Sequence, residues 1–131
     1  MRITDSKQVK KGDRIAMLER SNVHGVFSVS RWTVTAAGKQ KILLSREDGT
    51  MRGYQIYAWL LSKDNTNFRI LTVDNLESDV AELASAFNAQ EIASMEILIE
   101  RYSEPRYTAY RESMERDLIA QRNLQIEYRN L

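Results

Sequence analysis

The chain has 131 residues, of which 43% are hydrophobic and 28% charged, and a formal net charge of +1. This balance is typical of one folded domain or two very small ones, and it excludes a disordered chain. The absence of cysteine excludes disulfides, thiolate metal sites and cysteine nucleophiles. The sequence also has no apolar run of membrane-spanning length and no apolar signal core near its start, so we expect a cytoplasmic protein.

The two halves of the chain carry opposite charges. Residues 1–73 contain thirteen basic and six acidic side chains, which gives +7. Residues 74–131 contain six arginines and twelve acidic side chains, which gives −6. Such asymmetry indicates a basic surface with an anionic partner, an acidic surface with a cationic partner, or two halves that neutralise each other.

Short segments rich in β-branched residues fill the first half. With the turn signals between them, they predict strands over 14–19, 26–35, 41–45, 51–57 and 68–73. The dipeptide Asp48-Gly49 is a hairpin signal. Inside 26–35 the apolar alternation changes parity between Val29 and Trp32, which predicts a bulge or sharp bend near Ser30-Arg31. The first half therefore predicts a five-stranded antiparallel small barrel over residues 1–73.

From Asp74 onward the apolar period is helical. A stripe from Leu76 to Phe87 predicts one helix, and Asn88-Ala89-Gln90-Glu91 reads as a capping box that ends it and starts another. Pro105 suits the first turn of a third helix, which we expect to reach about Arg129. The fold class is therefore α+β, with a C-terminal acidic region of two to three helices over residues 74–131.

The last predicted helix carries a heptad-like apolar seam interrupted by Asp117 and Gln121. This helix either packs on the barrel and the preceding helices or projects as an arm that binds a partner or a second copy of the chain. The charge asymmetry and the length of this helix favour a homodimer over a monomer. The candidate partner-binding residues on the seam are Tyr107, Tyr110, Met114, Leu124 and Tyr128.

The segment Val9-Lys10-Lys11-Gly12-Asp13-Arg14-Ile15 is followed by a loop that ends at Gly25 and by Val26-Phe27-Ser28-Val29. This order resembles the opening of KOW-type and related small β-barrels, in which a Gly-Asp turn leads into the first strand. The resemblance covers residues 9–29, and the later helices have no counterpart in it. It implies a module that binds RNA, DNA or a protein of the transcription or translation machinery.

Basic side chains near the predicted turns interleave with aromatic ones. Lysine and arginine would neutralise phosphates, and exposed aromatic rings would stack on unpaired bases. Strand parity places Tyr54 and Ile56 on one face and Tyr57 and Trp59 on the other, so one of these pairs should face the core. We expect Trp59 to be buried, and the sequence leaves open whether Trp32 or Tyr54 is exposed. The candidate nucleic-acid-binding residues are Lys10, Lys11, Arg14, Arg31, Trp32, Lys39, Lys41, Arg46, Arg52 and Tyr54.

Catalysis is not expected. The one histidine, His24, lies in a polar loop where we expect it to be solvated, and no other conventional base is present. The glycines form no phosphate-binding loop, and no spacing predicts a metal site or a cofactor. We therefore expect a noncatalytic binding protein whose basic barrel contacts nucleic acid or a nucleic-acid-bound machine. The alternative is an inhibitor or adaptor of a nucleic-acid enzyme that acts through the acidic helices.

Overall fold

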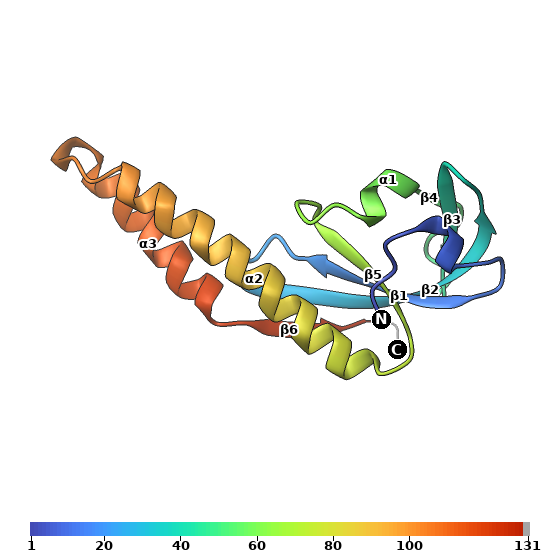
Figure 1. The fold of residues 1–131 in the computed structure, drawn as a ribbon. Helices are drawn as coiled ribbons and strands as arrows, with labels where there is room; N and C mark the ends of the chain where they lie inside the picture. Colours follow the sequence, from blue (N-terminus) through green and yellow to red (C-terminus); the bar gives the residue numbers. More distant parts are fainter. Residues whose placement is uncertain (130–131) are drawn as a thin grey trace.

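A computed structural model describes residues 1–129 as an α+β fold, in which a mainly antiparallel open sheet precedes a pair of helices (Figure 1). The elements in chain order are η1 (Ser6–Gln8), β1 (Arg14–Arg20), β2 (Val26–Ala37), β3 (Lys41–Arg46), β4 (Tyr54–Tyr57), α1 (Ala58–Leu61), β5 (Phe68–Thr72), α2 (Leu76–Arg101), η2 (Pro105–Tyr107), α3 (Thr108–Arg122) and β6 (Gln125–Tyr128).

The sheet follows the order β4-β3-β2-β1-β5, and β6 pairs in parallel with the first part of β2. All five predicted strands are present. The closed barrel is not confirmed, because β4 and β5 lie at opposite ends of the strand order. The twelve-residue β2 connects the sheet, since it pairs with β1 on one side and with β6 and then β3 on the other.

The change of parity along β2 has a different cause from the predicted bulge. The β1–β2 register is continuous from Arg14–Thr33 to Arg20–Phe27, so no bulge occurs near Ser30-Arg31. The irregularity in this strand lies between Val34 and Ala36, in the pairing with β3. Successive strand residues point to opposite faces, and here both faces of the sheet are covered.

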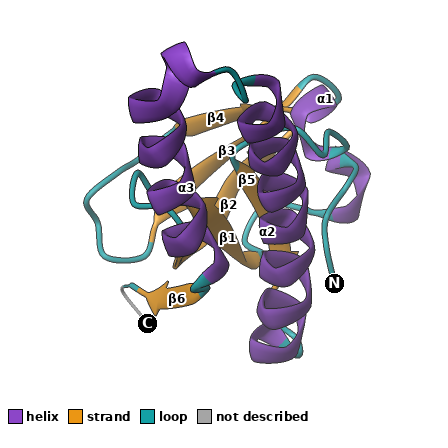
Figure 2. Cartoon of the chain, turned by 90° about the vertical axis from the view of Figure 1, so that its left-hand side faces the viewer, coloured by secondary structure: helices purple, strands orange, loops and turns teal. Residues whose placement is uncertain are grey.

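Two hydrophobic cores therefore lie on the two faces of the sheet. The first core contains Trp32 and Val34, together with residues of β1, β3, β4, β5 and α1. The second contains Phe27 and Val29, against which α2 packs its predicted apolar stripe. Phe27 meets Phe87 of α2 edge to face, with ring centroids 5.5 Å apart. Figure 2 shows both long helices in front of the sheet.

The helical half differs from its prediction at two places. Helix α2 is continuous through Asn88-Ala89-Gln90-Glu91, so the predicted break is wrong. Asn88 is buried, and its Nδ2 donates to the carbonyl oxygen of Gln121 (2.9 Å). The Asn88 side chain therefore bonds to α3 and does not cap a helix. The last helix ends at Arg122 rather than near Arg129, because the chain continues as β6 beside β2.

The α2–α3 hairpin extends beyond the sheet (Figure 1). Of the two predicted placements of the last helix, packing on the preceding helix is the one observed within the chain. Met114, Leu118 and Gln121 of α3 are buried, and Leu124 packs against the second core. The basic and acidic halves of the chain thus share the second core.

Candidate functional site

A groove lies between η1, the β2–β3 turn and the start of α1. Its volume is about 640 Å³, and its lining includes Lys7, Val9, Lys39 and Ala58. A capping box fixes η1, because the Asp5 carboxylate accepts from the Lys7 amide (2.9 Å) while the Gln8 side chain accepts from the Asp5 amide (2.9 Å). Sequence reasoning missed Lys7, although the Asp-x-x-Gln pattern would have located this turn.

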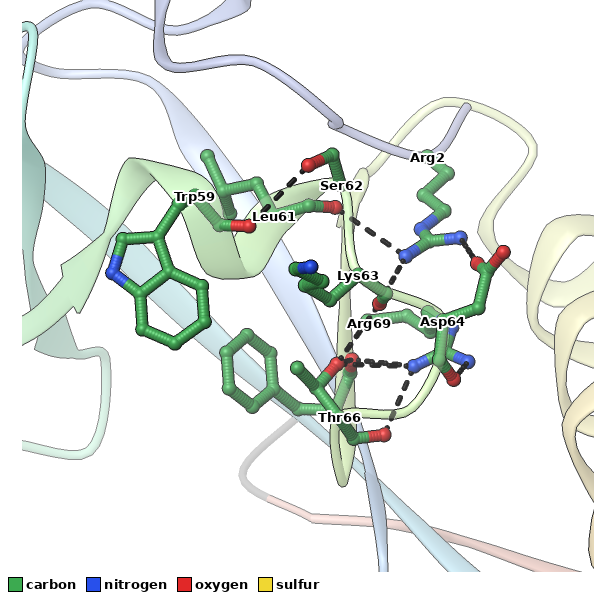
Figure 3. Close-up of polar contacts among 9 residues, drawn as sticks. Arg2, Trp59, Leu61, Ser62, Lys63, Asp64, Thr66 and Arg69 are labelled. Carbon is green, nitrogen blue, oxygen red and sulfur yellow. Dashed lines mark hydrogen bonds and ion pairs between the residues drawn. The ribbon is translucent and has the colours of Figure 1, made fainter.

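The exposed edge strand β4 continues from this groove, which we call the η1 groove. Lys41 lies directly opposite Tyr57 in the β3–β4 pair, and the Ala58 amide donates to the Gln40 carbonyl (2.8 Å). Tyr57 is 50% exposed and Trp59 is 61% exposed. The prediction that Trp59 is buried is wrong: the chain enters α1 after Tyr57, and Leu61 faces the core instead. Trp59 points away from the residues that follow it (Figure 3).

Trp32 belongs to the core and not to the surface. Its side chain is 3% exposed, and its Nε1 donates to Ser30 Oγ (2.8 Å). The structure therefore contradicts its assignment to a stacking surface. Tyr54 is the exposed member of the predicted pair, and its ring packs 5.5 Å from that of Trp32.

The predicted basic residues fall into two groups. Arg14 forms an ion pair with Glu47 (2.7 Å), and Arg46 forms one with Asp48 (3.2 Å). The half-buried Arg31 adds its positive charge near Glu47. The hydrogen bond from Arg14 lowers the pKa of Glu47. In residues 1–129 the other five form no ion pair and stay exposed: Lys10, Lys11, Lys39, Lys41 and Arg52. Lys10 and Lys11 follow Val9 at the η1 groove, whereas Arg52 precedes β4.

A second hollow opens between the two ends of the sheet. This β4–β5 cleft has a volume of about 520 Å³ and is lined by Glu19 of β1, Tyr54 of β4, Phe68 of β5 and the loop residues 65–67, among others. Glu19 lies directly opposite Phe68 in the β1–β5 pair. Sequence reasoning did not single out Glu19, which carried no motif.

Two arginines hold the loop that borders this cleft (Figure 3). Arg2 donates to the carbonyl of Lys63 (3.0 Å) and forms an ion pair with Asp64 (2.6 Å). Arg69 is 4% exposed and donates to the carbonyls of Thr66 (3.1 Å) and Asp64. These bonds to backbone carbonyls fix the loop in one conformation, so the cleft has a defined border.

A third hollow of about 370 Å³ lies where the sheet meets the helical hairpin. Arg20 forms an ion pair with Glu91 (2.5 Å), and Gln121 donates to the other oxygen of Glu91 (3.0 Å). His24 is exposed, as predicted, and its Nδ1 also lies 3.1 Å from the Gln121 side-chain oxygen. This network joins the β1–β2 loop to both helices and accounts for the polar seam position at Gln121.

The burial of Glu19 gives a test of the β4–β5 cleft by pH. Partial burial raises the pKa of Glu19, and the positive charges of Arg46 and Arg129 only partly oppose this. Ionisation of Glu19 therefore lowers the free energy of unfolding. This loss begins as the pH rises through the pKa of a glutamate in the unfolded chain, about 4.3. We expect Glu19→Gln to raise the free energy of unfolding by about 0.5 kcal/mol at neutral pH, a value kept small by solvent screening.

Urea denaturation at neutral pH and at about pH 3 measures this difference. The gain should disappear at the acid pH, where Glu19 is protonated in both states. A variant that is less stable than the wild type at neutral pH would contradict the assignment.

The free end of the α2–α3 hairpin carries a cluster of tyrosines. The Tyr102 ring lies 5.0 Å from those of Tyr107 and Tyr110, both of which sequence reasoning had placed on a partner-binding seam. Tyr110 is exposed, and so is Tyr128 on β6. The structure thus separates the five seam residues: Met114 and Leu124 are packed inside, whereas the tyrosines remain at the surface.

Comparisons of this chain with family models, curated proteins and solved structures found no match. The resemblance to KOW-type barrels over residues 9–29 therefore stays a prediction. Along residues 1–129, no helix has the length and apolar character needed to cross a membrane. In the same range, no group of three or more histidine, aspartate or glutamate side chains is placed to hold a metal ion.

Proposed function

We propose that this chain is a noncatalytic binding protein that holds single-stranded nucleic acid along the η1 groove and β4. The observation that carries this proposal is the juxtaposition of exposed Tyr57 and Trp59 with Lys39 and Lys41. Lysines without acidic partners can neutralise phosphates, while aromatic rings stack on unpaired bases of any sequence. The KOW-type resemblance points to the same class of ligand.

The geometry favours a single strand over a duplex. Tyr57 ends β4 and Trp59 follows in α1, so the two side chains stand beside the strand rather than on a helix that could enter a major groove. Arg52 lies before the opposite end of β4. A strand that runs along β4 would therefore meet positive charge at both ends and aromatic rings next to the η1 groove.

Reversing two charges tests the electrostatic part of this proposal. We expect Lys39→Glu/Lys41→Glu to weaken binding of a labelled single-stranded oligonucleotide by roughly 10-fold or more at low salt, because two phosphate contacts become repulsive. Fluorescence anisotropy measures the affinity. Arg101→Glu/Arg116→Glu, at exposed positions on α2 and α3, makes the same change in net charge away from the groove. Equal losses in the two variants would contradict a local site.

Removing an aromatic ring tests the stacking part. We expect Trp59→Ala to lower the affinity by about 1 to 3 kcal/mol without changing its dependence on salt, because a stacked base releases no counterions. The same anisotropy titration at several salt concentrations gives both quantities. Unchanged affinity would mean that Trp59 does not contact the nucleic acid.

A second candidate function is that of an adaptor or inhibitor that acts through the helices. The exposed apolar side chains Ile97, Leu98, Tyr110 and Ile119 on the α2–α3 hairpin favour it. Deleting residues 105–131 would not test this function cleanly, because α3 packs on α2 and β6 pairs with β2. A chain that acts only through the hairpin would bind no oligonucleotide even at low salt, which separates the two candidates.

A further inference from the structure

The β4–β5 cleft contains a carboxylate that the fold does not use. Glu19 is half-buried and forms no hydrogen bond or ion pair within residues 1–129. Its neighbour Arg20 also lines the cleft, but that guanidinium is engaged by Glu91. A partly desolvated carboxylate gains most from N–H donors placed close to both of its oxygens.

Flat apolar groups lie on the borders of the same cleft. The Tyr54 ring is partly exposed and packs against the buried Trp32, at 5.5 Å between ring centroids. Phe68 is half-buried directly opposite Glu19. Asn65 and Asn67 add amide side chains on the loop that Arg69 holds. The cleft thus combines an acceptor, two aromatic side chains and polar amides around about 520 Å³.

The two cations that act on Glu19 have carboxylate partners of their own. Arg46 and Arg129 form ion pairs with Asp48 (3.2 Å) and Glu127 (3.1 Å), respectively. A neutral planar ring with adjacent N–H donors would satisfy both oxygens of Glu19 and stack on the aromatic side chains that border the cleft. Guanine presents two such donors, N1–H and the 2-amino group, side by side, and they match the two oxygens of a carboxylate.

We propose that the β4–β5 cleft binds one unpaired guanine base, with Glu19 accepting from its N1–H and 2-amino groups and Tyr54 stacking on its ring. This inference rests on the proposed function, because β4 leads from the η1 groove to Tyr54 and Arg52 lies beside that end of the strand. The protein would then bind single strands generally through the η1 groove and favour guanine at one position.

The probe is guanosine monophosphate, and the readout is the fluorescence of Trp32, which contacts Tyr54. A Trp59→Phe background leaves Trp32 as the one tryptophan, since the chain has two. We expect guanosine monophosphate to change this fluorescence, inosine monophosphate to bind roughly 10-fold more weakly because it lacks the 2-amino group, and uridine monophosphate to bind more weakly still. Glu19→Gln should abolish these differences.

Glu47→Gln is the matched control, because Glu47 pairs with Arg14 and does not line this cleft. It should leave the preference for guanosine monophosphate unchanged. The stability measurement on Glu19→Gln shows whether that variant is folded. Equal affinities for the three nucleotides, or a preference that survives in Glu19→Gln, would overturn the proposal. The proposal would also be overturned if N-acetylarginine amide bound in a Glu19-dependent way while guanosine monophosphate did not bind.

The two proposals fail in different ways. Oligonucleotide binding without guanine preference would overturn the cleft assignment and leave the proposed function intact. Glu19-dependent binding of guanosine monophosphate, without oligonucleotide binding at low salt, would support the cleft and overturn the proposed function. If both stand, Lys39→Glu/Lys41→Glu should weaken the oligonucleotide but not guanosine monophosphate.

Discussion

Substituting Gly25 by alanine is expected to destabilise the protein by about 3 to 5 kcal/mol, the sum of a left-handed backbone cost and severe overpacking. Gly25 has a φ of +79°. An added Cβ would clash with the carbonyl oxygen of Ala120 and lie 2.9 Å from that of Asn123. Both obstacles are backbone atoms at the end of α3, so relief requires moving the helical hairpin away from the sheet.

Thermal denaturation measures this effect, and we expect the midpoint to fall by roughly 10 °C or more. Gly49→Ala is the matched control. Gly49 has nearly the same φ, +78°, but apart from its chain neighbours no atom of residues 1–129 lies within 4 Å of the place that an added methyl group would take. It should lose only the backbone contribution of about 1 to 2 kcal/mol. Similar losses in the two variants would show that α3 does not press on the β1–β2 loop.

Replacing Arg69 by methionine is expected to cost about 2 to 4 kcal/mol, because it removes a buried guanidinium and leaves carbonyl groups without donors. The Arg69 guanidinium packs 4.2 Å from the centre of the Phe87 ring and donates to the carbonyls of Thr66 (3.1 Å) and Phe68 (3.0 Å). Burial lowers the pKa of Arg69, but an arginine remains charged at neutral pH. The charge is therefore satisfied chiefly by backbone dipoles.

Urea denaturation of Arg69→Met beside Arg122→Met tests this assignment. Arg122 forms an exposed ion pair with Glu96 (3.3 Å), so its removal should cost less than about 1 kcal/mol. Arg69→Met should also weaken the binding of any ligand in the β4–β5 cleft, because residues 65–67 of the loop that Arg69 holds line this cleft. Equal stabilities for the two variants would mean that Arg69 does not hold the loop.

The strands and the first apolar stripe of α2 were predictable because their signals are local. The prediction assumed one buried face of the sheet, whereas both faces are buried. The run Ile15-Ala16-Met17-Leu18 already indicated this. Such an unbroken apolar run indicates a strand buried on both faces, which explains the parity change along β2 without a bulge. The open sheet edge depends on the placement of β4 relative to β5, for which residues 1–73 contain no local signal.

The errors in the helical half arise from partners that are distant in sequence. Asn88 resembled a helix cap, but its side chain bonds to Gln121 thirty-three residues away. The chain beyond Arg122 kept a helix-like spacing, yet its pairing with β2 makes it a strand. Local propensity is readily overridden by such tertiary contacts.

The candidate site was predicted in part. Of the predicted lysines, Lys39 lines the η1 groove, where the second lysine is Lys7, a residue that the sequence did not single out. The arginines were harder to assign, since Glu47 and Asp48 were interpreted as hairpin residues but also form ion pairs with Arg14 and Arg46. The prediction for Trp59 failed because Ile56, and not the pair Tyr57 and Trp59, faces the core, and local alternation does not indicate which face of β4 is buried.

In the proposed function, the η1 groove and β4 bind single-stranded nucleic acid through its phosphates and stacked bases. Fluorescence anisotropy of a labelled single-stranded oligonucleotide with the wild-type protein, over a series of salt concentrations, is the most direct test of this binding. We expect binding at low salt, with an association constant whose logarithm falls linearly with the logarithm of the salt concentration. Absence of binding at the lowest salt concentration would contradict the proposed function and would favour a protein partner at the helical hairpin.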